Sequence, residues 1–482
     1  MKDLARLALD TAAARGADYA DVRAIEFTRE DIQVKNGEVG GLELSDSAGL
    51  GVRVLVQGAW GFAATDDLTK EGAERCAAEA VAIGRASASL EHEPVRLAPE
   101  PAHRAVWTSQ CAVDPFSVPL ERKLDLLFRI DGEMRAVRGV KNAESFLSFL
   151  RKRQHYVSTE GADIDQTVTR SGGGFTSTAV SEREVQRRTF PQAEGFHQAL
   201  GYEFIESIPW MENARRIAEE SVALLTADQC PSGDFDLILE GSQLALQIHE
   251  SVGHPSELDR VLGMEANYAG TSFLTLDKQH KLAFGSKLVN LVADATLPQG
   301  LATFGFDDDG VEAQRWHIVQ DGLFVGYLTS RELAHRAGDA RSRGCVRSDG
   351  WHHIPMIRMV NLSLMPGSGT LEDLLTDTDH GLYLETNRSW SIDQLRYNFQ
   401  FKTELAWEIR KGKRVRMLKN PTYQGITTQF WNSCDFVCGP EEWKPWGVVN
   451  CGKGQPGQVA EITHGAAPAR FRKVRVGAGY DA

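Results

Sequence analysis

The sequence has little of what a secreted, membrane-spanning or nucleic-acid-binding protein requires. Its 482 residues include only seven cysteines, an odd number spread along the chain, so a disulfide framework is not expected. No apolar run approaches bilayer length, and charges at Asp3, Arg6 and Asp10 argue against a signal peptide. The net charge of −13 disfavours a duplex-binding surface. We therefore expect a cytoplasmic protein that contacts neither membranes nor nucleic acid directly.

What is present is an ordinary globular composition, with 42% hydrophobic and 25% charged residues. In the first half, apolar periodicity predicts a mixture of helices and strands, with Asn36-Gly37 as a hairpin turn. The predicted helices are 2–15, 69–86, 118–137 and 210–226, and the predicted strands are 19–27, 32–35, 42–44, 51–56 and 143–180. The last of these ends in Gly172-Gly173-Gly174, which we expect to be flexible.

The second half is predicted to be mainly β. Strand patterns occur at 237–240, 323–328, 357–364, 381–386, 397–410 and 423–430, and few helical patterns separate them, which favours an antiparallel sheet. A basic run, KGKRVR at 411–416, is typical of a solvated strand or hairpin. The break around Gln229–Gly233 suggests two domains, 1–228 and 229–482. The predicted fold class is α+β, with an N-terminal α/β domain followed by a C-terminal domain built on a curved, mainly antiparallel β-sheet.

The strongest chemical signal is an H-E-x-x-x-H pattern that begins at His249 and ends at His254. On a continuous α-helix these two histidines would lie about 140° apart, too far for one metal. Gly253 and Pro255 predict that the helix ends near Val252, so that His254 can turn back toward His249. The bland alternative is a pair of polar histidines at a helix end.

The motif suits a catalytic zinc site. Zinc binds neutral imidazoles, and a catalytic centre adds a third protein ligand and leaves one position for water. Glu250 is placed to take the proton from that water. The residues alone leave the third ligand open, with Cys451, in a strand that enters a glycine-rich turn, as one candidate.

Other potential ligands are predicted to be structural. Cys434 and Cys438 could form a second metal half-site, but two buried core thiols are the favoured interpretation. The pair His352-His353 is more typical of a strand than of a ligand set. Residues 307–310, DDDG, lack the alternation of a calcium loop and are predicted to be a solvated turn.

Several motifs together make the chain resemble the TldD/PmbA family. They are GADYADVR, VKNGEV and GVRVLVQGAWGFAAT within 16–65, HESVGHPSELDR, FDDDGVEAQRWHIVQDGLFVGYLTSRELA, RMVNLSLMPGSG and NCGKGQPGQ. They span nearly the whole chain in order. They resemble the family's N-terminal pattern, its metal segment and the stretch that follows it, and its two late motifs.

The resemblance implies a zinc metallopeptidase that acts on unfolded or extended peptides. Zn²⁺ would be bound by His249, His254 and Cys451, with Glu250 as the general base. PmbA-type chains lack the metal motif, so this chain resembles the catalytic members. The family also implies a homodimer, or a heterodimer with a PmbA-type chain, that encloses the active site. Two alternatives stay open: a zinc hydrolase of a non-peptide amide, and a non-catalytic partner or regulatory subunit of a TldD/PmbA complex.

Overall fold

The computed structural model describes residues 1–90 and 93–477. Its first half is one long, curved sheet in the order β3-β2-β1-β5-β6-β4, with β7 and β8 also paired to β6. All neighbours are antiparallel except β4 and β6. The strands are β1 Tyr19–Lys35, β2 Glu38–Val56, β3 Ala59–Thr65, β4 Arg104–Thr108, β5 Val140–Ser158, β6 Asp163–Val180, β7 Val185–Phe190 and β8 Phe196–Gln198.

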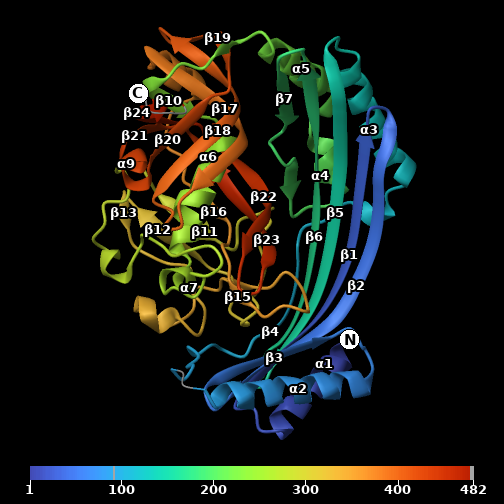
Figure 1. Ribbon diagram of the computed structural model, residues 1–482. Helices are drawn as coiled ribbons and strands as arrows, with labels where there is room; N and C mark the ends of the chain where they lie inside the picture. Colours follow the sequence, from blue (N-terminus) through green and yellow to red (C-terminus); the bar gives the residue numbers. More distant parts are fainter. Residues whose placement is uncertain (91–92, 478–482) are drawn as a thin grey trace.

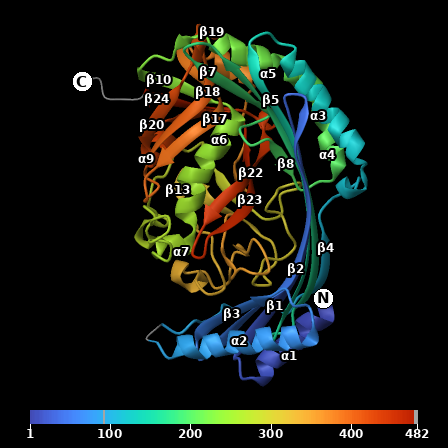
Figure 2. The ribbon, with the colours of Figure 1, turned by 45° about the vertical axis from the view of Figure 1, so that its right-hand side comes forward.

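Helices cover the convex face of this sheet, and its concave face is turned toward the second half of the chain (Figures 1 and 2). One group of helices lies at the end nearest the N-terminus, and another lies at the opposite end. Each group buries an apolar face against the strands and forms its own hydrophobic core. The helices are α1 Lys2–Ala14, α2 Lys70–Ala88, α3 Leu120–Arg135, α4 Tyr202–Ser207 and α5 Trp210–Leu224.

The predicted helices of the first half are confirmed, but its strands are longer than expected. Residues 19–35 form one strand rather than two, as do residues 38–56. The hairpin turn is confirmed, because Asn36 and Gly37 have φ angles of 51° and 83°. The glycines at 172–174 lie inside β6 and are buried, so their predicted flexibility is wrong. A Cβ at Gly172 would lie 1.9 Å from the His197 ring, so the glycine allows this close packing.

The second half contains a large, mainly antiparallel sheet in the order β17-β10-β24-β20-β18-β19-β9, with β21 also paired to β24. Only the β10–β17 and β9–β19 pairs are parallel among the described residues of this sheet. The strands are β9 Asp228–Gln229, β10 Gly233–Leu239, β17 His380–Ile392, β18 Asn398–Arg410, β19 Lys413–Lys419, β20 Thr422–Ile426, β21 Cys434–Val437 and β24 Ala469–Val476. The predicted α+β fold class is confirmed.

Smaller sheets pack beside it. One has the order β13-β12-β11-β16, and β14–β15 and β22–β23 are two-stranded. These strands are β11 Leu291–Asp294, β12 Arg315–Gln320, β13 Leu323–Phe324, β14 Val346–Arg347, β15 Met356–Ile357, β16 Leu362–Leu364, β22 Lys444–Lys453 and β23 Gln458–Ala466. The helices of this half are α6 Gly241–Ile248, α7 Leu258–Val261, α8 Leu371–Thr376 and α9 Thr427–Asn432. No helix in the described residues is long and apolar enough to cross a membrane.

Three predicted strands of the second half need correction. The strand at 323–328 is only two residues long, and the strand at 357–364 is interrupted between β15 and β16. The strand at 423–430 ends at Ile426, where α9 begins. The division into domains at 228 and 229 falls within β9, which pairs with β19 at the edge of the C-terminal sheet, and this division stays a prediction.

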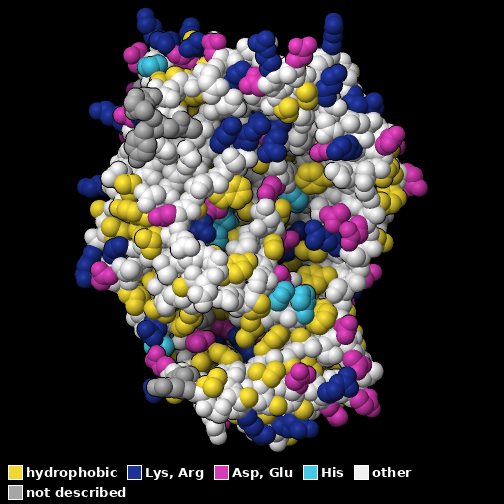
Figure 3. All heavy atoms as spheres, in the orientation of Figure 1, with side chains coloured by type: hydrophobic (Ala, Val, Ile, Leu, Met, Phe, Trp, Pro, Cys, Tyr) yellow, Lys and Arg dark blue, Asp and Glu magenta, His cyan; other side chains and the backbone are white. Residues whose placement is uncertain are grey.

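The basic run at 411–416 forms the exposed β18–β19 hairpin, as predicted. Lys and Arg side chains gather at this upper end of the molecule in Figure 3. Two of the arginines are paired, because Arg416 lies 2.7 Å from Asp228 and Arg414 lies 3.7 Å from Glu385. Neighbouring carboxylates therefore offset much of the local positive charge.

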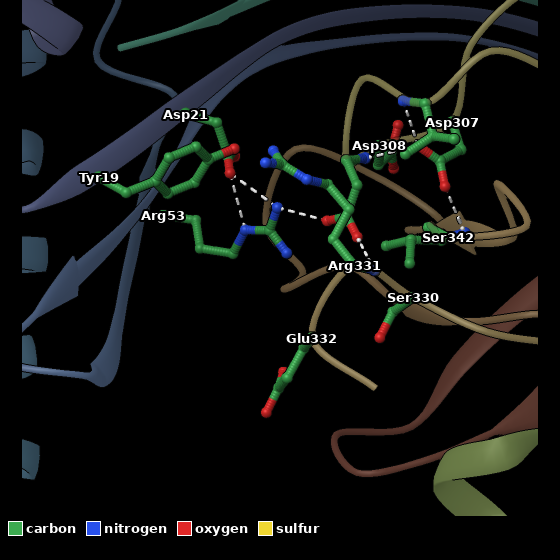
Figure 4. Close-up of polar contacts among 12 residues, drawn as sticks. Tyr19, Asp21, Arg53, Asp307, Asp308, Ser330, Arg331, Glu332 and Ser342 are labelled. Carbon is green, nitrogen blue, oxygen red and sulfur yellow. Dashed lines mark hydrogen bonds and ion pairs between the residues drawn. The ribbon is translucent and has the colours of Figure 1, made fainter. Parts of the chain in front are cut away.

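The loop 307–309 joins the two halves through a buried ion network (Figure 4). Arg53 bridges Asp21 and Asp309, with both N–O distances at 2.7 Å. Arg23 lies 3.6 Å from Asp308. The predicted solvated turn is wrong, because these carboxylates are at most 4% exposed. Sequence spacing could not reveal this, since the arginines come from β1 and β2, more than 250 residues away.

Candidate metal centre

The two histidines of the motif lie together because the helix widens at this point. Helix α6 passes into a five-residue π-helical turn, His249–Gly253, and then into a 3₁₀ turn, His254–Ser256. The backbone N–H of His254 donates to the carbonyl of His249, an i to i+5 bond. Such a bond places residues five apart on one face. The predicted helix end near Val252 is therefore wrong, since His254 keeps helical dihedrals of −56° and −44°.

The structure brings Cys451 to the same place. The candidate ligand atoms of His249, His254 and Cys451 all lie within 4.8 Å of one another, and all three residues are buried. Cys451 Sγ is 3.7 Å from His254 Nε2. Tetrahedral zinc, with bonds of about 2.05 Å to nitrogen and 2.3 Å to sulfur, separates two such ligands by about 3.6 Å. The donor set and its spacing therefore fit a zinc ion.

A hydrogen-bond chain fixes the tautomer of His249. His464 Nδ1 lies 2.8 Å from the Leu362 carbonyl, which can only accept, so this nitrogen carries the proton. His464 Nε2 is then an acceptor, and His249 Nδ1, at 2.7 Å, donates to it. Burial lowers the pKa of both imidazoles and keeps them neutral. The lone pair of His249 is thus on Nε2, the nitrogen left available to a metal.

The second imidazole is oriented by a buried carboxylate. His254 Nδ1 lies 3.0 Å from Glu257 Oε2 and donates to it, which leaves Nε2 free for a metal. Burial opposes ionisation of Glu257, but Lys453 and His254 outweigh it and hold its pKa well below the usual value. Burial likewise opposes ionisation of Cys451, but the protonated form of His254 and the Arg358 guanidinium outweigh it and lower the pKa of the thiol. A deprotonated sulfur is the form that binds metal.

Glu250 lies beside this cluster and is ionised. Burial opposes its charge, but His254 and Arg396 outweigh it and lower its pKa. The Arg396 guanidinium also forms an ion pair with its carboxylate. Both residues, with the half-exposed Trp390, line a pocket of ≈ 240 Å³ that contains the three candidate ligands. The arrangement places a carboxylate, a cation and a metal-binding set in one small space.

Sequence reasoning missed three residues of this site. Glu257 is three residues after His254, so the segment HPSE carried a local signal for it. His464 lies on β23, and Arg396 lies between β17 and β18. Each is more than 140 residues from its partner in the motif, and no local pattern marks it.

The remaining candidate clusters differ from this one. Cys434 and Cys438 are buried thiols, each with a pKa raised to about 12 by burial, and within the described ranges neither belongs to a possible metal cluster. His352 and His353 lie in a turn, not in the expected strand, and group with Asp349.

Comparison with known proteins supports the TldD/PmbA resemblance along most of the chain. Family models match it in three successive segments, described as PmbA/TldA metallopeptidase domain 1 at 20–84, central domain at 113–227 and C-terminal domain at 232–476. A metalloprotease of Methanocaldococcus jannaschii is 28% identical, covering 94% of this chain and 96% of that one. A zinc metalloprotease TldD homolog of Saccharolobus solfataricus is 20% identical, covering 96% and 97%.

Solved structures share the fold. A putative modulator of DNA gyrase from Thermotoga maritima superposes with a TM-score of 0.78 at 16% identity, covering 99% of this chain and 100% of that one. TldE from Thermococcus kodakarensis gives 0.74 at 15% identity, with the same coverage.

Proposed function

The chain belongs to the TldD/PmbA metallopeptidase family, and from that premise we propose that it is a zinc-dependent peptidase that hydrolyses unfolded or extended peptides. The observation that carries the proposal is the convergence of His249, His254 and Cys451, with both imidazoles oriented to present Nε2. The names of the relatives support a metal-dependent protease, and one of them specifies zinc.

The chemistry we propose is metal-assisted amide hydrolysis. When bound, zinc would polarise the scissile carbonyl and acidify a water molecule. Glu250 would accept the proton of that water and deliver it to the leaving amine. Arg396 would hold the Glu250 carboxylate in place and keep it ionised. Trp390 would cover the bound peptide at the rim of the pocket.

We also propose that the chain works as a dimer, with itself or with a PmbA-type partner, in the cytoplasm. Enclosure by a second subunit would admit only chains thin enough to enter, so folded proteins would be spared. The similarity of fold to TldE supports a PmbA-type partner. Light scattering would test the assembly, and full activity of an isolated monomer would contradict it.

The central experiment replaces Glu250 by Gln. The variant should keep one zinc per chain and lose about 10²- to 10⁴-fold in turnover, because an amide cannot accept the proton. Zinc content and hydrolysis of unfolded casein should be measured on the same preparation. The matched control is Glu194→Gln, since Glu194 lines the same pocket but binds the Asn450 amide at 2.6 Å.

The outcomes separate the candidate functions. Equal turnover of the Glu250→Gln variant and the wild type would remove Glu250 from the mechanism. Hydrolysis of small amides but not of casein would favour a non-peptide amidase. A chain that binds zinc and hydrolyses neither would fit a non-catalytic subunit.

A further inference from the structure

A second, larger cavity lies on the concave face of the N-terminal sheet. Its volume is ≈ 630 Å³. Strands β1, β2, β5 and β6 form one wall, and the segments 303–308, 347–349 and 459–461 form most of the other. Asn450 belongs to the wall of this cavity and also to the wall of the metal pocket. The two spaces therefore lie next to each other.

Most charges in the wall of this cavity are already compensated. Arg170 pairs with Glu461, Asp308 pairs with Arg23, and Arg29 pairs with Asp31. The Asp349 carboxylate is hydrogen-bonded to the His353 ring and accepts from the Val459 N–H. The Asp307 carboxylate accepts three backbone N–H groups, and burial raises its pKa well above the usual value, with Asp309 adding to the effect. Among the described residues of the wall, two cations form no ion pair within 4.0 Å, Lys152 and Arg347, although the charge of Asp308 acts on both.

Lys152 is the more available of the two. Within residues 1–90 and 93–477, its ammonium group has no hydrogen bond and no carboxylate oxygen within 4.0 Å. Burial lowers its pKa to about 8; the charge of Asp308 opposes this effect, and the nearby arginines add to it. The guanidinium of Arg347 is held by the carbonyls of Glu461, at 3.1 Å, and Met359, at 2.5 Å. The Arg347 guanidinium is thus held in a fixed position at the cavity wall, with the charges of Cys451 and Asp308 nearby but no carboxylate in ion-pair contact.

We propose that this cavity binds the C-terminal carboxylate of peptide substrates. Lys152 donates hydrogen bonds to the carboxylate, and Arg347 supplies a second positive charge. An extended peptide always carries one anion at a defined place, its C-terminus, whatever its sequence. The inference rests on the proposed peptidase function, and it adds that cleavage occurs at a set distance from the C-terminal end of the substrate.

A binding assay tests the proposal without turnover. Two peptides of one sequence, labelled at the N-terminus and ending either in a free carboxylate or in an amide, are titrated with zinc-loaded Glu250→Gln protein by fluorescence anisotropy. We expect the free acid to bind about tenfold more tightly, the effect of one good charge-assisted contact. Lys152→Gln should bring the ratio close to one by weakening only the acid. Lys141→Gln, on the exposed end of the same strand β5, is the charge-matched control and should keep the preference.

Several results would overturn the inference. They are equal affinities for acid and amide, a preference that survives Lys152→Gln, an equal weakening of both peptides, and no binding of either peptide. Inorganic phosphate that binds through Lys152 but does not displace the acid would assign the cavity to a free anion. Thermal unfolding of each variant shows whether it is folded.

Product analysis adds a second readout. Wild-type enzyme should release C-terminal fragments of constant length from peptides that differ only in N-terminal extension, as seen by mass spectrometry. C-terminal fragments whose length changes with the N-terminal extension would refute the proposed carboxylate subsite but not the peptidase function. A preference for the acid without any hydrolysis by the wild type would refute the peptidase and leave the subsite standing.

Discussion

Replacement of His464 by Phe should weaken zinc binding although His464 is not one of the proposed metal ligands. In the wild type, the Leu362 carbonyl fixes the proton of His464 on Nδ1, which in turn fixes the proton of His249 on Nδ1. The phenyl ring removes the acceptor. His249 can then carry its proton on Nε2, the nitrogen that we propose binds zinc. This proton must leave Nε2 before zinc can bind, which costs free energy.

The size of the expected loss in zinc affinity follows from other metal sites, where each metal-binding histidine donates its second ring N–H to a neighbouring group. Removal of that neighbouring group typically costs 10- to 100-fold in metal affinity, or about 1.4–2.7 kcal/mol. In the zinc-bound variant the Nδ1 proton of buried His249 has no acceptor, whereas the zinc-free variant can avoid this cost by carrying the proton on Nε2. The cost of the unpaired N–H therefore falls mainly on zinc affinity.

Competition with a fluorescent zinc chelator measures the affinity. His464→Gln should lie between wild type and His464→Phe, because the amide oxygen can still accept from His249. His335→Phe, at an exposed position, should match the wild type. Unchanged zinc affinity in His464→Phe, with the fold intact, would refute the reasoning about the tautomer.

Three further predictions concern other groups. Cys451, with its lowered pKa, should be alkylated by iodoacetamide in zinc-free protein and protected by zinc, and peptide mapping that shows no protection would contradict its role as ligand. Burial lowers the folded-state pKa of His197 to about 4, so between pH 6.5 and 4 only the unfolded chain takes up a proton at this residue. The free energy of unfolding of the wild type therefore falls by about 3 kcal/mol across this window because of His197, and His197→Gln should lack this part of the fall. Denaturant unfolding at several pH values checks this. Asp309→Asn should cost about 3 kcal/mol in urea unfolding, since it removes one carboxylate of the buried Arg53 pair, and a loss below about 0.5 kcal/mol would mean that Asp21 alone suffices.

The helices and the fold class could be predicted because their signals are local. Apolar spacing marks one face of a helix wherever that face packs. The strand extensions could not be predicted, because residues 38–47 of β2 are largely exposed and show no alternation. Their extended form comes from pairing with β1 along its whole length, which is a partner effect and not a property of the segment.

The candidate site was likewise predictable from the sequence only in part. The pairing of His249 with His254 was predictable from the motif, but the π-helical turn that achieves it was not, since Gly253 and Pro255 are usual signs of a helix end. A Cβ at Gly253 would lie 2.0 Å from the sulfur of Met359, so glycine is there to admit a neighbour. Gly253 therefore allows close packing at this position and does not end the helix.

Both proposed sites depend on contacts between the two halves of the chain. Residues 192–194, from the first half, line the metal pocket, and Gln192 and Glu194 bind Gly447 and Asn450 on β22, the strand that carries Cys451. The larger cavity likewise has one wall from each half. The buried ion network at 307–309 holds these walls together, so weakening it should impair the geometry of the site as well as stability. Asp309→Asn is therefore expected to reduce peptide binding under conditions where the protein is still folded, whereas a purely structural network would leave binding intact until unfolding begins.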